Sequence, residues 1–178
     1  MTPDVLDYVK RTAQLEPPGR RVLDVGSFDV NGTIRPAFST ADEIVGLDLR
    51  PGPNVDVVAD VEEFARPAGA GVSLAPFDLV VSAEMLEHTP HPWLAVEGMV
   101  QVLRPGGRLI LTTRSAGFGR HDYPADYWRF SPEALRILFE DVGLVDVEVE
   151  EDPDQPGAFA TGIRPGGKTS SSDNGRTT

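Results

Sequence analysis

Short apolar runs recur along the chain and predict the strands of a parallel sheet. Five of them lack regular polar alternation, which is typical of strands buried on both faces. They span Arg21 to Val25, Glu43 to Leu47, Val55 to Ala59, Phe77 to Ser82 and Arg108 to Thr113. Helices or turns fit between them, so the pattern predicts strands and helices that alternate five times.

Three helices are predicted where proline-containing starts precede apolar residues at helical spacing. Thr2-Pro3-Asp4 offers a cap, a first-turn proline and a first-turn acid, and Ser131-Pro132-Glu133 repeats this before a helix that stops at Gly143. The third helix spans Pro92 to Leu103, and Pro105-Gly106-Gly107 then turns the chain into a strand.

The C-terminal part changes to a different pattern. Valines and acids alternate from Val145 to Glu150, which predicts a half-exposed strand with its valines on one face. After a turn, Ala158 to Ile163 is predicted to return as an antiparallel partner. Residues 164–178 are predicted to be a disordered tail. The sum is one α/β domain over residues 1–163, a three-layer sandwich with a mostly parallel sheet.

The amino-acid composition excludes several classes of functional site. With 178 residues the chain suits one domain, and without cysteine it has no thiolate nucleophile, iron–sulfur cluster or cysteine zinc site. No apolar run approaches 18 residues and the N-terminus carries acids, so we expect neither a membrane span nor a secretory signal, and a cytoplasmic location. The net charge of −12 argues against nucleic-acid binding. This negative charge either serves solubility alone or includes acidic side chains that face a cationic ligand.

The loop after the first predicted strand argues against a dinucleotide. In a G-x-G-x-x-G fingerprint that starts at Gly26, Phe28 would replace the second glycine and Asn31 the third. Phe28 would block the approach of a pyrophosphate, and Asp29 would repel it. We therefore expect a ligand without phosphate and with a net positive charge.

Acids stand at three consecutive strand ends, where open α/β sheets bind ligands. Asp24 lies near the end of the first strand, Asp48 can accept both hydroxyls of a ribose, and Asp60 can accept an adenine amino group. Val61 would add an apolar edge contact. The alternative interpretation of each acid is a helix cap or a solvated strand end.

In order and spacing, these motifs resemble those of class I S-adenosylmethionine-dependent methyltransferases. The motifs are Val22-Leu23-Asp24-Val25-Gly26-Ser27, Asp48, Asp60-Val61, Phe77 to Ser82 followed by Glu84-Met85-Leu86-Glu87-His88, and Leu103 to Ile110. The likeness is greatest to the group with a Glu-His pair after the fourth strand (methyltransferase type 11), which includes quinone-biosynthesis enzymes. It covers about residues 20 to 163. It implies a Rossmann-like seven-stranded sheet with strand order 3-2-1-4-5-7-6 and strand 7 antiparallel.

The resemblance also implies the cofactor, S-adenosylmethionine, and its contacts. Asp24, Gly26 and Ser27 would hold its methionine end, Asp48 and Leu49 its ribose, Asp60 and Val61 its adenine, and Ser82 and Glu84 would form the wall beside the sulfonium. This chain departs from the family in the first loop, which usually holds two or three glycines. Here only Gly26 precedes Phe28.

Aromatic residues cluster after the fifth predicted strand, in the segment from Arg114 to Phe130. Such a cluster at the carboxyl end of the strands is typical of a substrate wall, for which Tyr123, Tyr127 and Trp128 are the candidates. The alternative for Trp128 and Phe130 is packing of the following helix onto the sheet.

His121 is the candidate general base, because histidine titrates near neutrality and Asp122 is adjacent. His88 and His91 lie three residues apart, but prolines on both sides of His91 interrupt the helix that would align them. We therefore predict no metal site.

The leading hypothesis is a methyltransferase that acts on a small molecule, with the acceptor atom undetermined. The alternative is a methyltransferase fold that has lost catalysis and acts through a partner. A nicotinamide-dependent oxidoreductase is the third hypothesis, against which Phe28 and Asp29 argue. The oligomeric state stays open.

Overall fold

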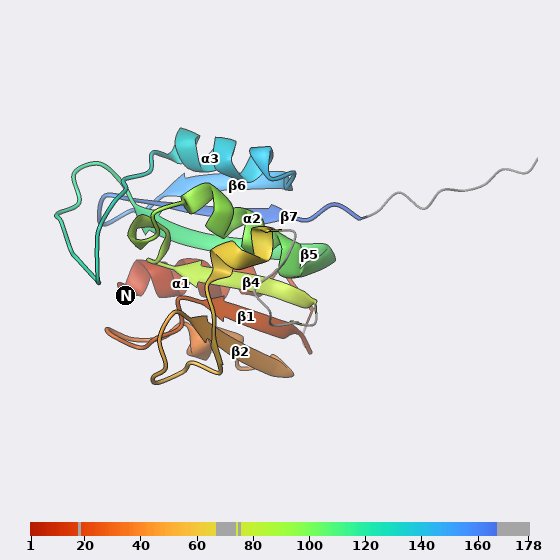
Figure 1. The fold of residues 1–178 in the computed structure, drawn as a ribbon. Coiled ribbons are helices and arrows are strands. Elements are labelled where there is room, and N and C mark those ends of the chain that lie inside the picture. The colour runs from red at the N-terminus through yellow and green to blue at the C-terminus, as the bar shows by residue number, and fades with distance from the viewer. Residues whose placement is uncertain (18, 67–73, 75, 167–178) are drawn as a thin grey trace, which may run out of the picture.

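The computed structural model describes residues 1–17, 19–66, 74 and 76–166, and its centre is a seven-stranded sheet (Figure 1). The strands are β1 (Arg21–Val25), β2 (Glu43–Asp48), β3 (Val57–Val58), β4 (Phe77–Ala83), β5 (Leu103–Arg114), β6 (Val145–Glu151) and β7 (Gly157–Ile163). Their order is β3-β2-β1-β4-β5-β7-β6. Strand β7 is antiparallel to its neighbours β5 and β6, and all pairs among β1, β2, β3, β4 and β5 are parallel. The predicted strand order is confirmed.

Three α-helices begin at the predicted prolines: α1 (Pro3–Ala13), α2 (Pro92–Val102) and α3 (Pro132–Asp141). The Thr2 hydroxyl accepts a hydrogen bond from Val5 N at 3.4 Å, and the Ser131 hydroxyl accepts one from Ala134 N at 3.2 Å. These bonds satisfy first-turn amides that have no partner within the helix. Among the described residues, no helix is long and apolar enough to cross a membrane.

The sheet separates two apolar cores, as expected for a three-layer sandwich. Neighbouring strand residues point to opposite faces, so Leu23 packs under α2 and α3 while Val22 packs under α1. Figure 1 shows α2 and α3 on the same side of the sheet. The predicted three layers are confirmed, with α1 alone forming the α-helical cover of the second face among the described residues.

The predicted alternation of strand and helix is wrong between β1 and β3. The β1 to β2 connection contains only the short 3-10 helix η1 (Arg35–Phe38), and the β2 to β3 connection contains no helix. Pro51 and Pro53 explain the second case, because proline removes a helix hydrogen bond and clashes with the preceding turn. The third predicted strand is also shorter, since only Val57–Val58 pairs with β2.

Strand β5 begins five residues earlier than predicted. Leu103 already pairs with Phe77, and the next pair along the sheet joins Arg108 to Leu79. The predicted Pro-Gly-Gly turn therefore lies inside β5 as an irregularity, where Gly106 adopts a φ of +78°.

Two predictions near the C-terminus need correction. Val145 is 44% exposed, because a register shift and the positive φ of Asp146 (+51°) turn it away from the face that Val147 and Val149 share. Arg164, assigned from sequence to the tail, belongs to the fold: its guanidinium donates to Val100 O at 2.9 Å. The rest of the predicted tail, from residue 167, lies outside the described residues.

Candidate active site

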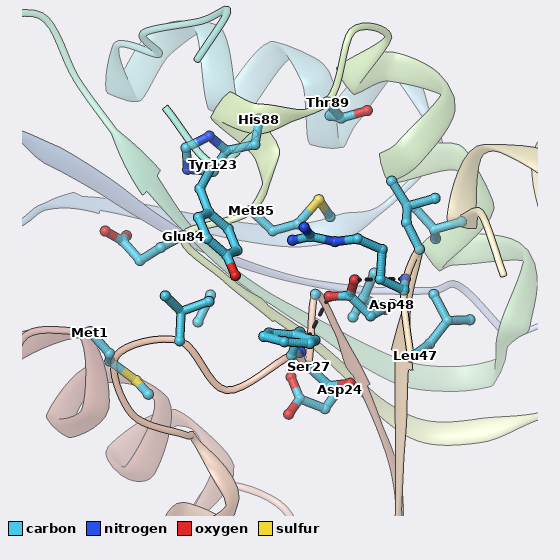
Figure 2. A pocket seen from close by; sticks show the side chains of 18 of the residues that line it. Met1, Asp24, Ser27, Leu47, Asp48, Glu84, Met85, His88, Thr89 and Tyr123 are labelled. Carbon is cyan, nitrogen blue, oxygen red and sulfur yellow. Dashed lines mark hydrogen bonds between the residues drawn. The ribbon is translucent and has the colours of Figure 1, made fainter. Parts of the chain in front are cut away.

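A cavity of about 930 Å³ opens at the carboxyl ends of β1, β2 and β4 (Figure 2). This is where open α/β sheets bind their ligands, and the volume falls within the range of small-molecule pockets. The predicted site residues that line it are Asp24, Gly26, Ser27, Asp48, Leu49, Asp60, Val61, Glu84, His121 and Tyr123. They come from separate parts of the chain, and the fold brings them together at one sheet edge.

Gly26 brings the backbone close to the cavity at the end of β1. Its φ is +82°, and a Cβ atom there would lie 2.7 Å from Cγ of Met85. Its amide donates to Leu47 O at 2.9 Å, and the amide of Ser27 donates to the same carbonyl at 3.1 Å. A side chain at position 26 would therefore strain the backbone and displace Met85.

Asp24 lies beneath this loop and is almost fully buried. Burial raises the pKa of its carboxyl group to about 7; the nearby Asp48 raises it further and Arg35 opposes the shift. A buried carboxyl group with a high pKa holds a proton near neutrality, when an exposed aspartate would be ionised.

Phe28, which replaces a glycine of the dinucleotide fingerprint, is a packed residue of this site. Its amide donates to Asp48 Oδ2 at 3.2 Å. A Cβ atom on Gly52 would lie 2.0 Å from the Phe28 ring, so the ring rests directly on the backbone of the next loop. Asp29 accepts a hydrogen bond from Gly32 N at 2.9 Å. The unusual first loop is therefore held in a defined conformation.

Asp48 and Asp60 combine two roles. Asp48 Oδ1 accepts from Arg50 N at 3.2 Å, and its other oxygen holds the first loop. Asp60 Oδ1 accepts from Glu62 N at 2.9 Å and so caps the short helix η2 (Val61–Ala65). The cap interpretation is thus correct for Asp60, and both carboxylates also line the cavity. A carboxylate has about four acceptor sites, so both keep free capacity for a ligand.

Glu84 follows β4 with a φ of +56°, which is uncommon for a residue with a side chain. It accepts from the Thr112 hydroxyl at 3.2 Å and forms an ion pair with Arg114, which in turn pairs with Asp152 at 3.1 Å. Burial and then the nearby Glu87 raise the pKa of Glu84 to about 7, although Arg114 lowers it.

His121 faces two carboxylates. Its Nε2 lies 3.5 Å from Glu87 Oε1 and its Nδ1 lies 3.4 Å from Asp126 Oδ2. The nearby Glu87 carboxylate is the main reason why the pKa of His121 is raised. Asp122, the partner suggested by sequence, instead accepts from Arg120 at 2.8 Å. The expectation of an Asp122 partner is wrong, because the chain turns Asp126 toward the ring.

The pair of histidines examined in the sequence, His88 and His91, is not the pair that the structure brings together. His91 Nδ1 lies 2.9 Å from Glu62 Oε2, away from His88. Glu87, His88 and His121 instead each offer one ligand atom, and these atoms lie within 4.8 Å of one another. The buried Glu87 Oε1 at their centre has no hydrogen-bond partner among the described residues.

Comparison with known proteins identifies the family. The sequence model described as "Methyltransferase domain" matches residues 1–149. The chain belongs to the class I S-adenosylmethionine-dependent methyltransferases. The resemblance of its ordered motifs to this family is thereby confirmed.

Relatives of this methyltransferase domain include a Xanthomonas axonopodis pv. citri protein named ubiquinone biosynthesis O-methyltransferase. The two are 36% identical over 126 residues, which cover 64% of this chain and 50% of the relative. The chain therefore spans about half the length of the curated relatives it matches.

Solved structures share the fold of this methyltransferase domain. One is the Burkholderia thailandensis 1,6-didemethyltoxoflavin-N1-methyltransferase with bound 1,6-didemethyltoxoflavin and S-adenosylhomocysteine (TM-score 0.69, 17% identity, 90% of this chain and 78% of that one). Another is the Haemonchus contortus phosphoethanolamine N-methyltransferase 2 with S-adenosyl-L-methionine (TM-score 0.65, 18% identity, 90% and 52%).

Three predicted site residues of this methyltransferase domain do not line the cavity: Ser82, Tyr127 and Trp128. Ser82 is fully buried within β4, behind the wall that Ala83 and Glu84 form. Trp128 donates its indole N–H to Thr89 O at 3.0 Å, which agrees with the packing interpretation. Tyr127 is 56% exposed on the outside. Conversely, Phe28 and Arg50 line the cavity, although neither was predicted from sequence to be a ligand-binding residue.

Proposed function

We propose that this chain is an S-adenosylmethionine-dependent methyltransferase that acts on a small molecule. The observation that carries the proposal is the series of acids, Asp24, Asp48 and Asp60, along one edge of a cavity that Gly26 also lines. The free acceptor capacity of Asp48 and Asp60 suits ribose hydroxyls and an adenine amino group, and the negative charge of these two carboxylates suits a sulfonium. The cavity has the volume for this cofactor beside an acceptor.

Each end of the cavity has a different proposed role. Asp48 and Leu49 would bind the ribose and Asp60 and Val61 the adenine, while the backbone at Gly26 and Ser27, supported by Asp24, would hold the methionine end. When bound, S-adenosylmethionine supplies a methyl group for in-line displacement. Catalysis then depends mainly on holding the acceptor in line in a site that excludes water.

His121 is our proposed proton acceptor, because it faces the cavity near Glu84 and Tyr123. The carboxylates of Glu87 and Asp126 lie beside its two ring nitrogens and raise its pKa, so His121 would accept a proton only in the neutral form that prevails at higher pH. A base of this kind is required only when the acceptor atom carries a proton. Turnover that is unchanged in His121→Ala would remove this role.

A small aromatic hydroxyl compound is the acceptor class that we propose to test first. The rings of Phe118 and Tyr123 line the cavity and can stack on such a compound. The relatives at 31 to 36% identity are named O-methyltransferases. The net charge of −12 disfavours a nucleic acid as acceptor.

The direct test measures S-adenosylhomocysteine formed from S-adenosylmethionine with a panel of phenols and catechols. We expect product with at least one acceptor and at least a tenfold lower rate with Asp48→Asn at subsaturating cofactor. Binding of the cofactor without any product across hydroxyl, amine and carbon acceptors would instead support a fold that acts through a partner.

A further inference from the structure

The side chain of Arg50 links three loops at the mouth of the cavity. Its Cζ atom lies 5.4 Å from the ring centroid of Phe28 and 4.9 Å from that of Tyr123. Phe28 belongs to the loop after β1, Arg50 to the loop after β2, and Tyr123 to the segment after β5. One guanidinium therefore connects loops from three strands above the predicted cofactor position.

The two aromatic contacts differ in how firmly they are anchored. Phe28 is fixed by its amide bond to Asp48 and by the close backbone at Gly52. Tyr123 is 42% exposed, and among the described residues its side chain makes no hydrogen bond that would hold it. In Figure 2 the Tyr123 side chain lies on the same side of the cavity as His88 and Glu84, and Asp48 lies on the opposite side. The contact between Arg50 and Tyr123 is thus the one that can open.

Arg50 also differs from the other arginines that line the cavity. Arg114 pairs with Glu84 and Asp152, and Arg66 pairs with Glu63. Within the part of the chain that the structure describes, no carboxylate lies within ion-pair distance of Arg50. Its two ring contacts are cation–π interactions, which are weak enough to break and reform during ligand exchange.

We propose that Arg50 retains the bound cofactor by holding Tyr123, and with it the segment after β5, closed over the cavity. The inference rests on the proposed function, because the retained ligand is the adenosyl cofactor. Arg50 is a positioning residue here: it acts through Tyr123 and touches no reacting atom.

Surface plasmon resonance with immobilised protein and S-adenosylhomocysteine measures the dissociation rate separately from the association rate. For Arg50→Ala we expect dissociation about tenfold faster, which corresponds to the loss of about 1.4 kcal/mol, with association changed less than twofold. Tyr123→Leu should release the ligand equally fast. Arg50→Lys and Tyr123→Phe should stay near the wild type, because each keeps a cation over a ring.

The double variant Arg50→Ala/Tyr123→Leu tests whether the residues act together. We expect it to release the ligand no faster than either single variant, as for two ends of one contact. Arg120→Ala is the matched control, since Arg120 lies on the same segment and bonds only Asp122 among the described residues. It should leave both rates unchanged.

Unchanged dissociation in Arg50→Ala, with a thermal midpoint equal to that of the wild type, would overturn the inference. Slower release or tighter binding would also overturn it, because Arg50 would then obstruct the cavity. These outcomes leave the proposed function intact. No binding of S-adenosylhomocysteine by the wild type would instead contradict the proposed function itself.

Discussion

Asp48 illustrates how one residue joins the loop structure to the ligand. Its carboxylate holds the amides of Phe28 and Arg50 and still faces the cavity. Asp48→Asn removes the charge and one acceptor, and we expect S-adenosylhomocysteine to bind roughly ten- to a hundredfold more weakly. Calorimetric titration checks this. Asp42→Asn, at the opposite end of β2, is the control, and an equal loss in both variants would contradict the role of Asp48.

Asp24 makes stability depend on pH. Its pKa is raised from 3.8 to about 7, so the native state holds a proton that the unfolded chain releases between these values. The wild type should therefore lose stability as pH rises through this window. In Asp24→Asn this loss is absent, so the stability of the variant relative to the wild type should rise by about 4 kcal/mol between pH 4 and pH 8. Urea unfolding at several pH values measures the difference, which would be constant if Asp24 were ionised throughout.

At the scale of residues, the sequence could place a side chain at the cavity where a strand end fixes its position, while its contact with the cofactor stays a proposal. Asp24, Asp48 and Asp60 stand at or next to such ends, and all three line the cavity. Prediction failed for Tyr127 and Trp128, because the path of a long loop depends on tertiary bonds such as that from Trp128 to Thr89 O. No sequence pattern marks such bonds in advance.

Arg114 joins separate elements at the end of β5. Its fully buried guanidinium pairs with Glu84 after β4 and with Asp152 between β6 and β7. Arg114→Ala would leave two carboxylates without a cation, and we expect unfolding free energy to fall by about 3 to 5 kcal/mol. Arg120→Ala, which breaks an exposed pair with Asp122, should cost much less. Equal losses in urea unfolding would contradict the importance of burial.

Among the elements, helix starts and buried strands were predictable because local chemistry specifies them. Proline, capping hydroxyls and apolar spacing placed α1, α2 and α3 correctly. The early start of β5 and the irregularity at Asp146 were not predictable, since both depend on the register with a neighbouring strand. Register is set across the sheet and leaves little trace in either segment alone.

For the whole molecule, the strand order came from family resemblance, and the apolar pattern alone gave only an α/β sandwich with a mostly parallel sheet. This order places the ends of β1, β2 and β4 at one cavity, where acids and a packed Phe28 replace the glycine-rich cradle of a pyrophosphate. The central claim is that this cavity binds an adenosyl sulfur ligand.

Isothermal titration of the chain with S-adenosylhomocysteine, and separately with NAD, tests that claim most directly. We predict one site for S-adenosylhomocysteine with a Kd in the micromolar range, about −8 kcal/mol, and no binding of NAD. Binding of NAD, or no binding of S-adenosylhomocysteine, would contradict it.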